Sequence, residues 1–207
     1  MNRSSKYTNP GKVFLSKHGR VTDRVGILKY TEFLRREAGL DAEPPVNLTA
    51  IYDHFGISHK SVPLDGPAGL SNPDAGLVLI NSEDPKRRQR FSQGHELIEL
   101  LFAAQSDSSQ WRSRGRTLFS SDTQEKLCEE GAAELLMPQS SFRSYLDKWG
   151  VYLESGKLLA ERYEVSLYAA LMRTVKLGPG KHAFVRWKLS WKPIEKRSFP
   201  EANQLAL

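Results

Sequence analysis

The chain has 207 residues, of which 39% are hydrophobic and 26% are charged. These proportions are typical of a globular protein and exclude a chain that is disordered over most of its length. We expect no secretory leader and no membrane span, because the first residues enter no apolar segment and no run approaches about 18 apolar residues. Cys128 is the only cysteine, which excludes an internal disulfide and favours a reducing compartment, the cytoplasm.

The net charge of +6 arises from 30 basic and 24 acidic residues. Such an excess permits an anionic partner such as nucleic acid. A moderately basic surface is more often simply hydrated, however. Nucleic acid is therefore a candidate partner that the charge allows but does not favour.

The N-terminal part of the chain predicts a tail and two helices. Residues 1–20 place basic side chains among Ser, Asn, Gly and Pro without apolar periodicity, which predicts a flexible basic tail. Apolar residues recur at helical spacing over 25–37, which predicts a helix. A second helix is predicted over 47–55, with Asn47 as its N-cap.

The pattern changes after the second helix. Short β-rich runs at 58–64, 68–71 and 77–81 are separated by turns that contain Gly and Pro, which predicts a small three-stranded antiparallel sheet. The next predicted helix, 91–104, is apolar nearly all round and belongs in the centre of the core. A polar, arginine-rich loop follows, and residues 123–136 predict a further helix.

The C-terminal part predicts a pair of helices and a strand. The helices are expected over 156–163 and 166–177, with Ser166 as the N-cap of the second. Their order resembles a helix-turn-helix, but the second helix begins with apolar residues where a DNA-reading helix has polar or basic ones. Packing onto the core is therefore the favoured role. Residues 183–192 alternate in polarity, as a strand with one buried face does.

The stretch FSQGHELIELLF at 91–102 carries the candidate chemistry. On a helix, His95 and Glu99 share a face and could bind one ion. Glu96 is rotated by roughly 100°, so it could act as a general base beside the ion without being a ligand. The pattern is short, and an ordinary polar pair on a helix is the alternative.

Burial favours a metal over that alternative. Apolar side chains flank His95 and Glu99 on the same helical face, namely Phe91, Ile98 and Phe102. Both polar side chains should therefore point inward. An ionised carboxylate is costly to bury without a partner, and a bound cation would remove that cost.

A third ligand is expected from the helix over 123–136, since a catalytic zinc usually has three protein ligands. At about 100° per residue, Glu125 lies roughly 35° from the centre of that helix's apolar face and Glu129 roughly 75° from it. Glu130 and Glu134 are placed on the far side. Glu125 is the predicted ligand and Glu129 the alternative, while an ion pair with Arg or Lys remains open for either.

Arginines on both sides of the His-Glu helix could line a cleft that favours acidic substrate segments. They are Arg87, Arg88 and Arg90 before it and Arg112, Arg114 and Arg116 after it. The second group could equally belong to a disordered insertion.

Taken in order, the motifs over residues 22–145 resemble the ImmA/IrrE metallo-endopeptidases. The matching segments are PVNL at 45–48, FGI at 55–57, GLVLIN at 76–81, QRFS at 89–92, GHEL at 94–97, EKLC at 125–128 and AAELLMP at 132–138. The run AAELLMP behind a His-Glu helix is far more specific than the His-Glu pair alone.

The resemblance implies a zincin-like core that holds Zn2+ on His95, on the residue at 99 and on Glu125, with Glu96 as the base. It also implies a regulatory endopeptidase with a protein substrate. That substrate would be a helix-turn-helix repressor, which the enzyme cleaves or inactivates in a stress response or in the control of phage and mobile elements.

The chain departs from the family at position 99, where Glu99 replaces the usual histidine. A site with one His and two Glu has a net charge of about zero, so its water should ionise less readily than at good catalytic zinc sites. A harder ion such as Mn2+ or Fe2+ would suit the added carboxylate. Two functions therefore stay open: a metal-dependent peptidase, and a catalytically weak peptidase-fold protein that regulates by binding a repressor or DNA.

The predicted fold class is α+β, with a mainly helical metallopeptidase core, a small antiparallel sheet, and a C-terminal helical pair and strand. The predicted division places a flexible tail at 1–20, the metallopeptidase domain at 21–150 and the C-terminal part at 151–207.

Overall fold

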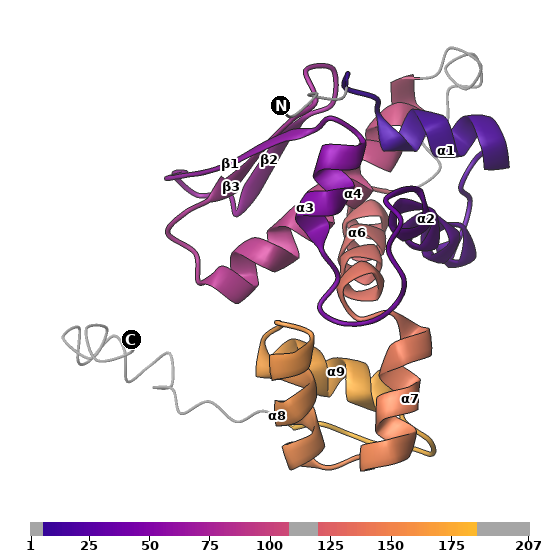
Figure 1. Ribbon diagram of the computed structural model, residues 1–207, viewed down its shortest axis with the longest axis vertical. Helices are drawn as coiled ribbons and strands as arrows, with labels where there is room; N and C mark the ends of the chain where they lie inside the picture. Colours follow the sequence, from indigo (N-terminus) through magenta and orange to yellow (C-terminus); the bar gives the residue numbers. More distant parts are fainter. Residues whose placement is uncertain (1–5, 108–119, 186–207) are drawn as a thin grey trace.

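The computed structural model describes residues 6–107 and 120–185 (Figure 1). The fold is α+β and mainly helical, as predicted. Figure 1 shows the sheet and helices α1 to α6 in one body, with α7 to α9 grouped below them. None of the helices in these described residues is long and apolar enough to cross a membrane.

The first helix lies where a flexible tail was predicted. α1 (Pro10–His18) begins at Asn9, whose side chain accepts hydrogen bonds from N–H groups of the first turn. Phe14 is 2% exposed, and its ring lies edge-on to Tyr30 with centroids 5.2 Å apart. The tail prediction is therefore wrong for residues 10–18, because a buried aromatic ring rather than a long apolar stripe holds this helix to the core.

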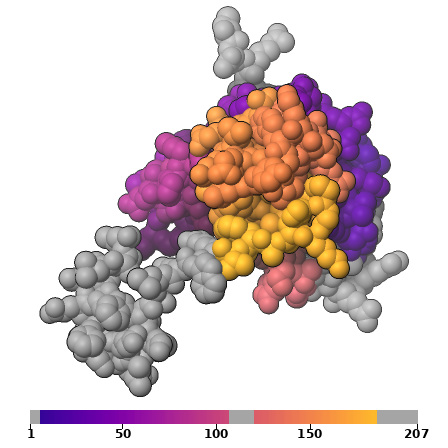
Figure 2. All heavy atoms as spheres, turned by 90° about the horizontal axis from the view of Figure 1, so that it is seen from below, coloured from indigo at the N-terminus to yellow at the C-terminus, as the bar shows by residue number. Residues whose placement is uncertain are grey.

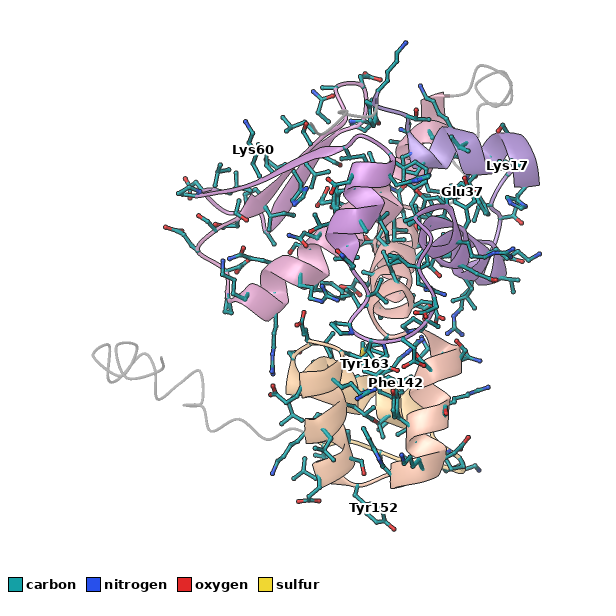
Figure 3. The ribbon with its side chains drawn as sticks, in the orientation of Figure 1. Lys17, Glu37, Lys60, Phe142, Tyr152 and Tyr163 are labelled. Carbon is teal, nitrogen blue, oxygen red and sulfur yellow. The ribbon has the colours of Figure 1, made fainter. Side chains whose placement is uncertain are left out.

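The next two helices agree with the sequence prediction. α2 (Arg24–Glu37) and α3 (Leu48–His54) occupy the expected segments. Asn47 caps α3, since its side chain accepts a hydrogen bond from the first turn at 3.1 Å. Lys17 of α1 pairs with Glu37 of α2 at 2.9 Å, which joins the ends of the two helices (Figure 3).

The sheet has three strands, but it is mixed rather than antiparallel. The strands are β1 (Ser58–Val62), β2 (Gly69–Asn72) and β3 (Leu77–Asn81), in the order β1-β3-β2. β3 pairs antiparallel with β2 and parallel with β1. The chain reverses direction after β1 and again after β2, so β3 returns alongside β1 in the same direction. The antiparallel prediction assumed neighbouring strands pair in sequence order, and the central position of β3 overturns it.

Two long helices form the centre of the core. α4 (Lys86–Asp107) contacts α1, α6 and the strands β2 and β3, and α6 (Ser121–Leu136) packs along it. The expected burial of α4 on nearly all sides is confirmed by residues with no exposed area, namely Leu97, Ile98, Leu100 and Leu101. A helix enclosed in this way presents its polar residues to other protein groups rather than to bulk water.

Three helices form the lower group, of which the sequence analysis expected two. α7 (Gln139–Trp149) was not predicted, whereas α8 (Leu153–Arg162) and α9 (Leu167–Leu177) match the expected pair. The ring centroids of Phe142 in α7 and Tyr163 at the end of α8 lie 5.2 Å apart (Figure 3). The predicted boundary at 150 thus falls inside a packed helical group, which covers the centre of the face in Figure 2.

Part of the predicted strand over 183–192 can be compared with the structure. Residues 181–185 have no regular secondary structure, and the remainder of the segment lies outside the described residues. The arginines at 112, 114 and 116 also lie outside them.

A buried ion pair joins α6 to α9. Glu134 is 7% exposed and Arg173 is 5% exposed, and a guanidinium nitrogen of Arg173 bonds the Glu134 carboxylate. Arg173 also donates to the carbonyl oxygen of Met137 at 2.7 and 3.1 Å. Glu134 was placed on the side of its helix away from the predicted ligand; the lower helices cover that side, so Glu134 is buried there.

Replacing Arg173 by Met should lower the free energy of unfolding by about 3–5 kcal/mol, because Glu134 would stay buried without its cation. Lys176→Met is the matched control. Lys176 lies one turn further along α9 and pairs with Glu130 of α6 at 2.5 Å, but both side chains are partly exposed. That control should lose less than about 1 kcal/mol. Urea denaturation measures both changes, and equal losses would contradict a special role for the buried pair.

Candidate metal centre

The packing of α4 against α6 brings the three predicted ligands together. His95 and Glu99 lie one turn apart on α4, with 3.9 Å between His95 Nε2 and Glu99 Oε1. From α6, Glu125 places Oε2 at 3.7 Å from the same nitrogen. The imidazole of His95 is thus flanked by two carboxylates from different helices.

These separations fit a shared cation. Four ligand atoms at about 2.0–2.2 Å from a tetrahedral ion lie roughly 3.4 Å from one another. The distances from His95 to Glu99 and to Glu125 exceed that value by half an ångström or less. The described ligand atoms that lie within 4.8 Å of one another belong to His95, Glu99 and Cys128, so the Glu125 side chain would have to move inward to share a divalent ion with His95 and Glu99.

Glu125 approaches His95 from the rim of the site. Its side chain is 58% exposed, against 16% for His95. The buried face of α6 includes Cys128, Gly131 and Leu135, and it is turned further from Glu125 than the helical projection predicted. Glu125 is consequently a group that can move toward an ion at little packing cost.

The sequence analysis noted Cys128 only as the single cysteine, and the structure places it near the candidate ligands. Cys128 has no exposed area, and its Sγ donates to Glu99 Oε1 at 3.6 Å. Ligating atoms of His95, Glu99 and Cys128 lie within 4.8 Å of one another. Burial raises the pKa of the Cys128 thiol, and the neighbouring carboxylates raise it further. The spacing of three residues from Glu125 could have indicated this shared face.

Glu96 lies between the metal helix and the edge of the sheet. It is 7% exposed, and a Cβ at Gly69 of β2 would lie 2.7 Å from Glu96 Oε1. Burial raises the pKa of Glu96, while a hydrogen bond from Ser71 and the proximity of His95 act in the opposite direction. A side chain at 69 would therefore displace the Glu96 carboxylate, so glycine at this position lets Glu96 lie against β2.

A cleft of about 240 Å³ opens at this point, between the start of β2, the first half of α4 and α6. Its walls include Gly69, Phe91, His95, Glu96 and Glu125. The cleft therefore gives a ligand access to the general-base candidate Glu96 and to two of the metal candidates, His95 and Glu125.

Further residues named in the sequence analysis divide between this cleft and other contacts. Arg88 and Glu129 also line it. Arg87 instead pairs with Glu161 at 2.6 Å, and Arg90 lies 3.7 Å from Glu164. One of these three arginines is therefore available at the cleft, and the other two fasten α4 to the lower helices.

The comparison with known families agrees with this site. Residues 53–175, more than half of the chain, match the model of the IrrE N-terminal-like domain. The chain belongs to this metallopeptidase family. The matched segment contains His95, Glu96, Glu99 and Glu125, and membership implies a divalent metal.

Two relatives are named as radiation response metalloproteases. The chain is 30% identical over 127 residues to IrrE of Deinococcus radiodurans, which covers 60% of this chain and 38% of the relative. It is 32% identical over 117 residues to IrrE of Deinococcus deserti, covering 56% and 42%. The chain spans about two fifths of the length of these relatives.

Among solved structures, a Mycobacterium tuberculosis transcriptional regulator superposes with a TM-score of 0.49 at 16% identity. The superposition covers 80% of this chain and 50% of that one.

Glu125→Gln should weaken Zn2+ binding at least about tenfold, because an amide oxygen is a poorer zinc ligand than a carboxylate. Glu129→Gln is the matched control, one turn further along the same helix and lining the same cleft. It should bind Zn2+ within about twofold of the parent. Competition titration with a zinc-sensitive dye measures the affinities. If Glu129→Gln weakens Zn2+ binding and Glu125→Gln does not, Glu129 rather than Glu125 is the ligand.

Proposed function

We propose that the protein is a metal-dependent endopeptidase that regulates transcription by cleaving or inactivating a helix-turn-helix repressor. The observation that carries the proposal is a buried glutamate, Glu96, beside the cluster of His95, Glu99 and Glu125 at an open cleft. The family's metallopeptidase character supports the reaction class.

His95, Glu99 and Glu125 would hold the ion, with Zn2+ as the first candidate and Mn2+ or Fe2+ as alternatives. When bound, such an ion polarises a carbonyl group and makes water a better nucleophile. The two carboxylates match the preference of harder ions for oxygen. Cys128 is a further donor near Glu99, since its Sγ lies within 4.8 Å of the ligand atoms of His95 and Glu99.

Glu96 would carry the proton during peptide hydrolysis. As a general base, its carboxylate takes a proton from the attacking water, and as an acid it returns that proton to the leaving amine. Burial favours the protonated carboxyl, so the group can hold the proton between the two steps. The contact with β2 fixes the side chain in the cleft.

The edge of β2 favours an extended peptide as the substrate. β2 pairs with β3 on one side only, and in the described part of the chain no strand covers its other edge. Free N–H and C=O groups of an edge strand can pair with an added strand. Because Gly69 has no side chain, a peptide along this edge would pass close to Glu96.

The regulatory part of the proposal rests on the resemblance to the ImmA/IrrE proteins. The relatives from Deinococcus are named for a radiation response, which suits a protease that acts in stress. A repressor encoded by the host, a phage or a mobile element is the proposed target. We place this activity in the cytoplasm, where such repressors bind DNA.

Glu96→Gln should abolish cleavage of a susceptible repressor, lowering the rate by about 10²-fold or more, because the amide cannot accept the proton. The assay incubates the metal-loaded full chain with purified helix-turn-helix repressors and follows their intact masses. Zn2+ affinity should stay near that of the parent, which separates lost chemistry from lost metal. If parent and variant leave every repressor equally intact, the peptidase proposal fails for that panel.

Glu99→His should increase the rate of the same cleavage. The change raises the net charge of the loaded centre by about one unit, which lowers the pKa of a nearby water. Glu99→Gln serves as the control, since it removes the same charge but leaves a poor ligand, so it should lose metal rather than gain rate. Faster cleavage by the histidine variant but not by the glutamine variant is expected. Slower cleavage by the histidine variant would show that Glu99 suits the metal that the protein uses.

Glu99 also supports a second candidate function, a peptidase-fold protein that inactivates a repressor by binding alone. The expected difference is that Glu96→Gln would still release the repressor from its operator, with the repressor intact. A DNA-binding version is less favoured, because Leu167 and Tyr168 at the start of α9 expose apolar surface.

A further inference from the structure

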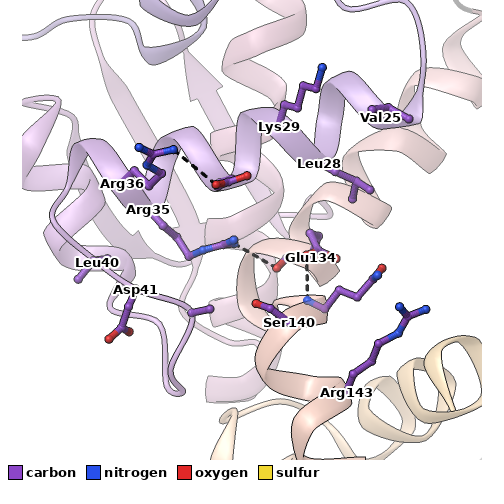
Figure 4. Close-up of a pocket in the computed structure, with 13 residues that line it drawn as sticks. Val25, Leu28, Lys29, Arg35, Arg36, Leu40, Asp41, Glu134, Ser140 and Arg143 are labelled. Carbon is purple, nitrogen blue, oxygen red and sulfur yellow. Dashed lines mark hydrogen bonds and ion pairs between the residues drawn. The ribbon is translucent and has the colours of Figure 1, made fainter.

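A second cavity lies away from the metal centre, between α2, the end of α6 and the start of α7 (Figure 4). Its volume is about 600 Å³, within the range of roughly 300–1,000 Å³ that is typical of small-molecule sites. No part of the proposed peptidase chemistry uses it.

A buried guanidinium is the main polar feature of this cavity. Arg35 is 7% exposed and extends from α2 toward Glu134, as Figure 4 shows. Its hydrogen bond to the Glu134 carbonyl oxygen is long, at 3.4 Å. Burial lowers the pKa of the Arg35 guanidinium, against the favourable charge of Glu134. A buried cation with one weak acceptor leaves most of its donors available to an anion.

The other charged groups around the cavity leave a positive excess. Glu32 is paired with Arg36 at 3.6 Å, and the Glu134 carboxylate is held by Arg173. Asp41 accepts the backbone N–H of Glu43 at 2.9 Å. Two further cations line the cavity, Lys29 and Arg143. In the described part of the chain neither of them has a carboxylate within 4.0 Å.

The start of α7 adds backbone donors. The helix has Pro138 at its N-cap position, which makes no side-chain cap hydrogen bond, and the Glu134 carboxylate bonds the first N–H of the helix. The Gln139 N–H is bonded to Glu134 at 2.9 Å, while Ser140, the next residue, lines the cavity. With the Glu134 carboxylate on the first N–H, the helix dipole and the other N–H groups of the first turn still favour an anion at Ser140.

Apolar side chains complete the wall. Val25 and Leu28 of α2 and Leu40 after it face the cavity. Val25 is 54% exposed, so a bound apolar group would remove it from water. The ligand that fits this lining has an anionic head and a short apolar body.

We propose that this cavity binds a small organic anion, with its phosphate or carboxylate group at Arg35, Arg143 and the start of α7 and its apolar part against Leu28 and Leu40. The site is independent of the metal centre and does not depend on peptidase activity.

Isothermal titration of the full chain with hexyl phosphate, hexanoate and inorganic phosphate tests the proposal. Hexyl phosphate or hexanoate should bind with a Kd of about 1 mM or lower, and more tightly than inorganic phosphate, because the chain adds apolar contact. Which of the two binds identifies the head group. If neither binds at up to about 10 mM, the proposal is wrong.

Variants locate the site. Arg143→Ala should weaken binding at least about threefold, and Arg35→Met at least about tenfold, because charge-assisted hydrogen bonds are lost. Lys148→Ala, an exposed cation on the same helix outside the cavity, should bind within about twofold of the parent. Circular dichroism checks that Arg35→Met folds. If it does not fold, the affinity of Arg143→Ala for the organic anion tests the site alone. Equal effects of Arg143→Ala and Lys148→Ala would mean nonspecific attraction and would overturn the proposal.

Discussion

The crowding of carboxylates around one imidazole is the constraint on which the rest of the site depends. Glu96 is buried beside His95, and Glu99 and Glu125 lie within 4.0 Å of the His95 ring nitrogen. Three carboxyl groups around one histidine favour a cation, since like charges held together in a partly buried place repel one another. A divalent ion at His95 would satisfy all of them, and the family to which the chain belongs uses such an ion.

The fold maintains this crowding by enclosing α4. The helix is covered by α1, α6 and the edge of the sheet, so its polar side chains contact other protein groups rather than bulk water. Close approach of β2 at Gly69 places Glu96 at the cleft. Arg87 and the buried pair of Glu134 and Arg173 attach the lower helices to the same two helices that hold the ligands. The same two helices, α4 and α6, therefore carry the candidate ligands and hold the lower helices in place.

Features set by local geometry were predictable from the sequence, and features set by distant packing were not. The shared face of His95 and Glu99 follows from helical spacing. The approach of Cys128 to Glu99 and the burial of Glu134 were missed, because the residues that pack against α6 lie in other segments of the chain; the partner of Glu134 lies 39 residues away. The sheet was mistaken for the same reason, since the parallel pairing of β1 and β3 depends on where β2 packs. α1, however, did have a local signal, an Asn9-Pro10 start, that was overlooked.

Anomalous diffraction from crystals of the full chain grown with Zn2+ would test the metal centre most directly. We expect a peak at about 2.0–2.2 Å from His95 Nε2, with carboxylate oxygens of Glu99 and Glu125 at similar distances. Cys128 should remain outside bonding distance. A map without a peak near His95, or one in which a lysine or arginine fills the space between the carboxylates, would contradict a metal at this centre.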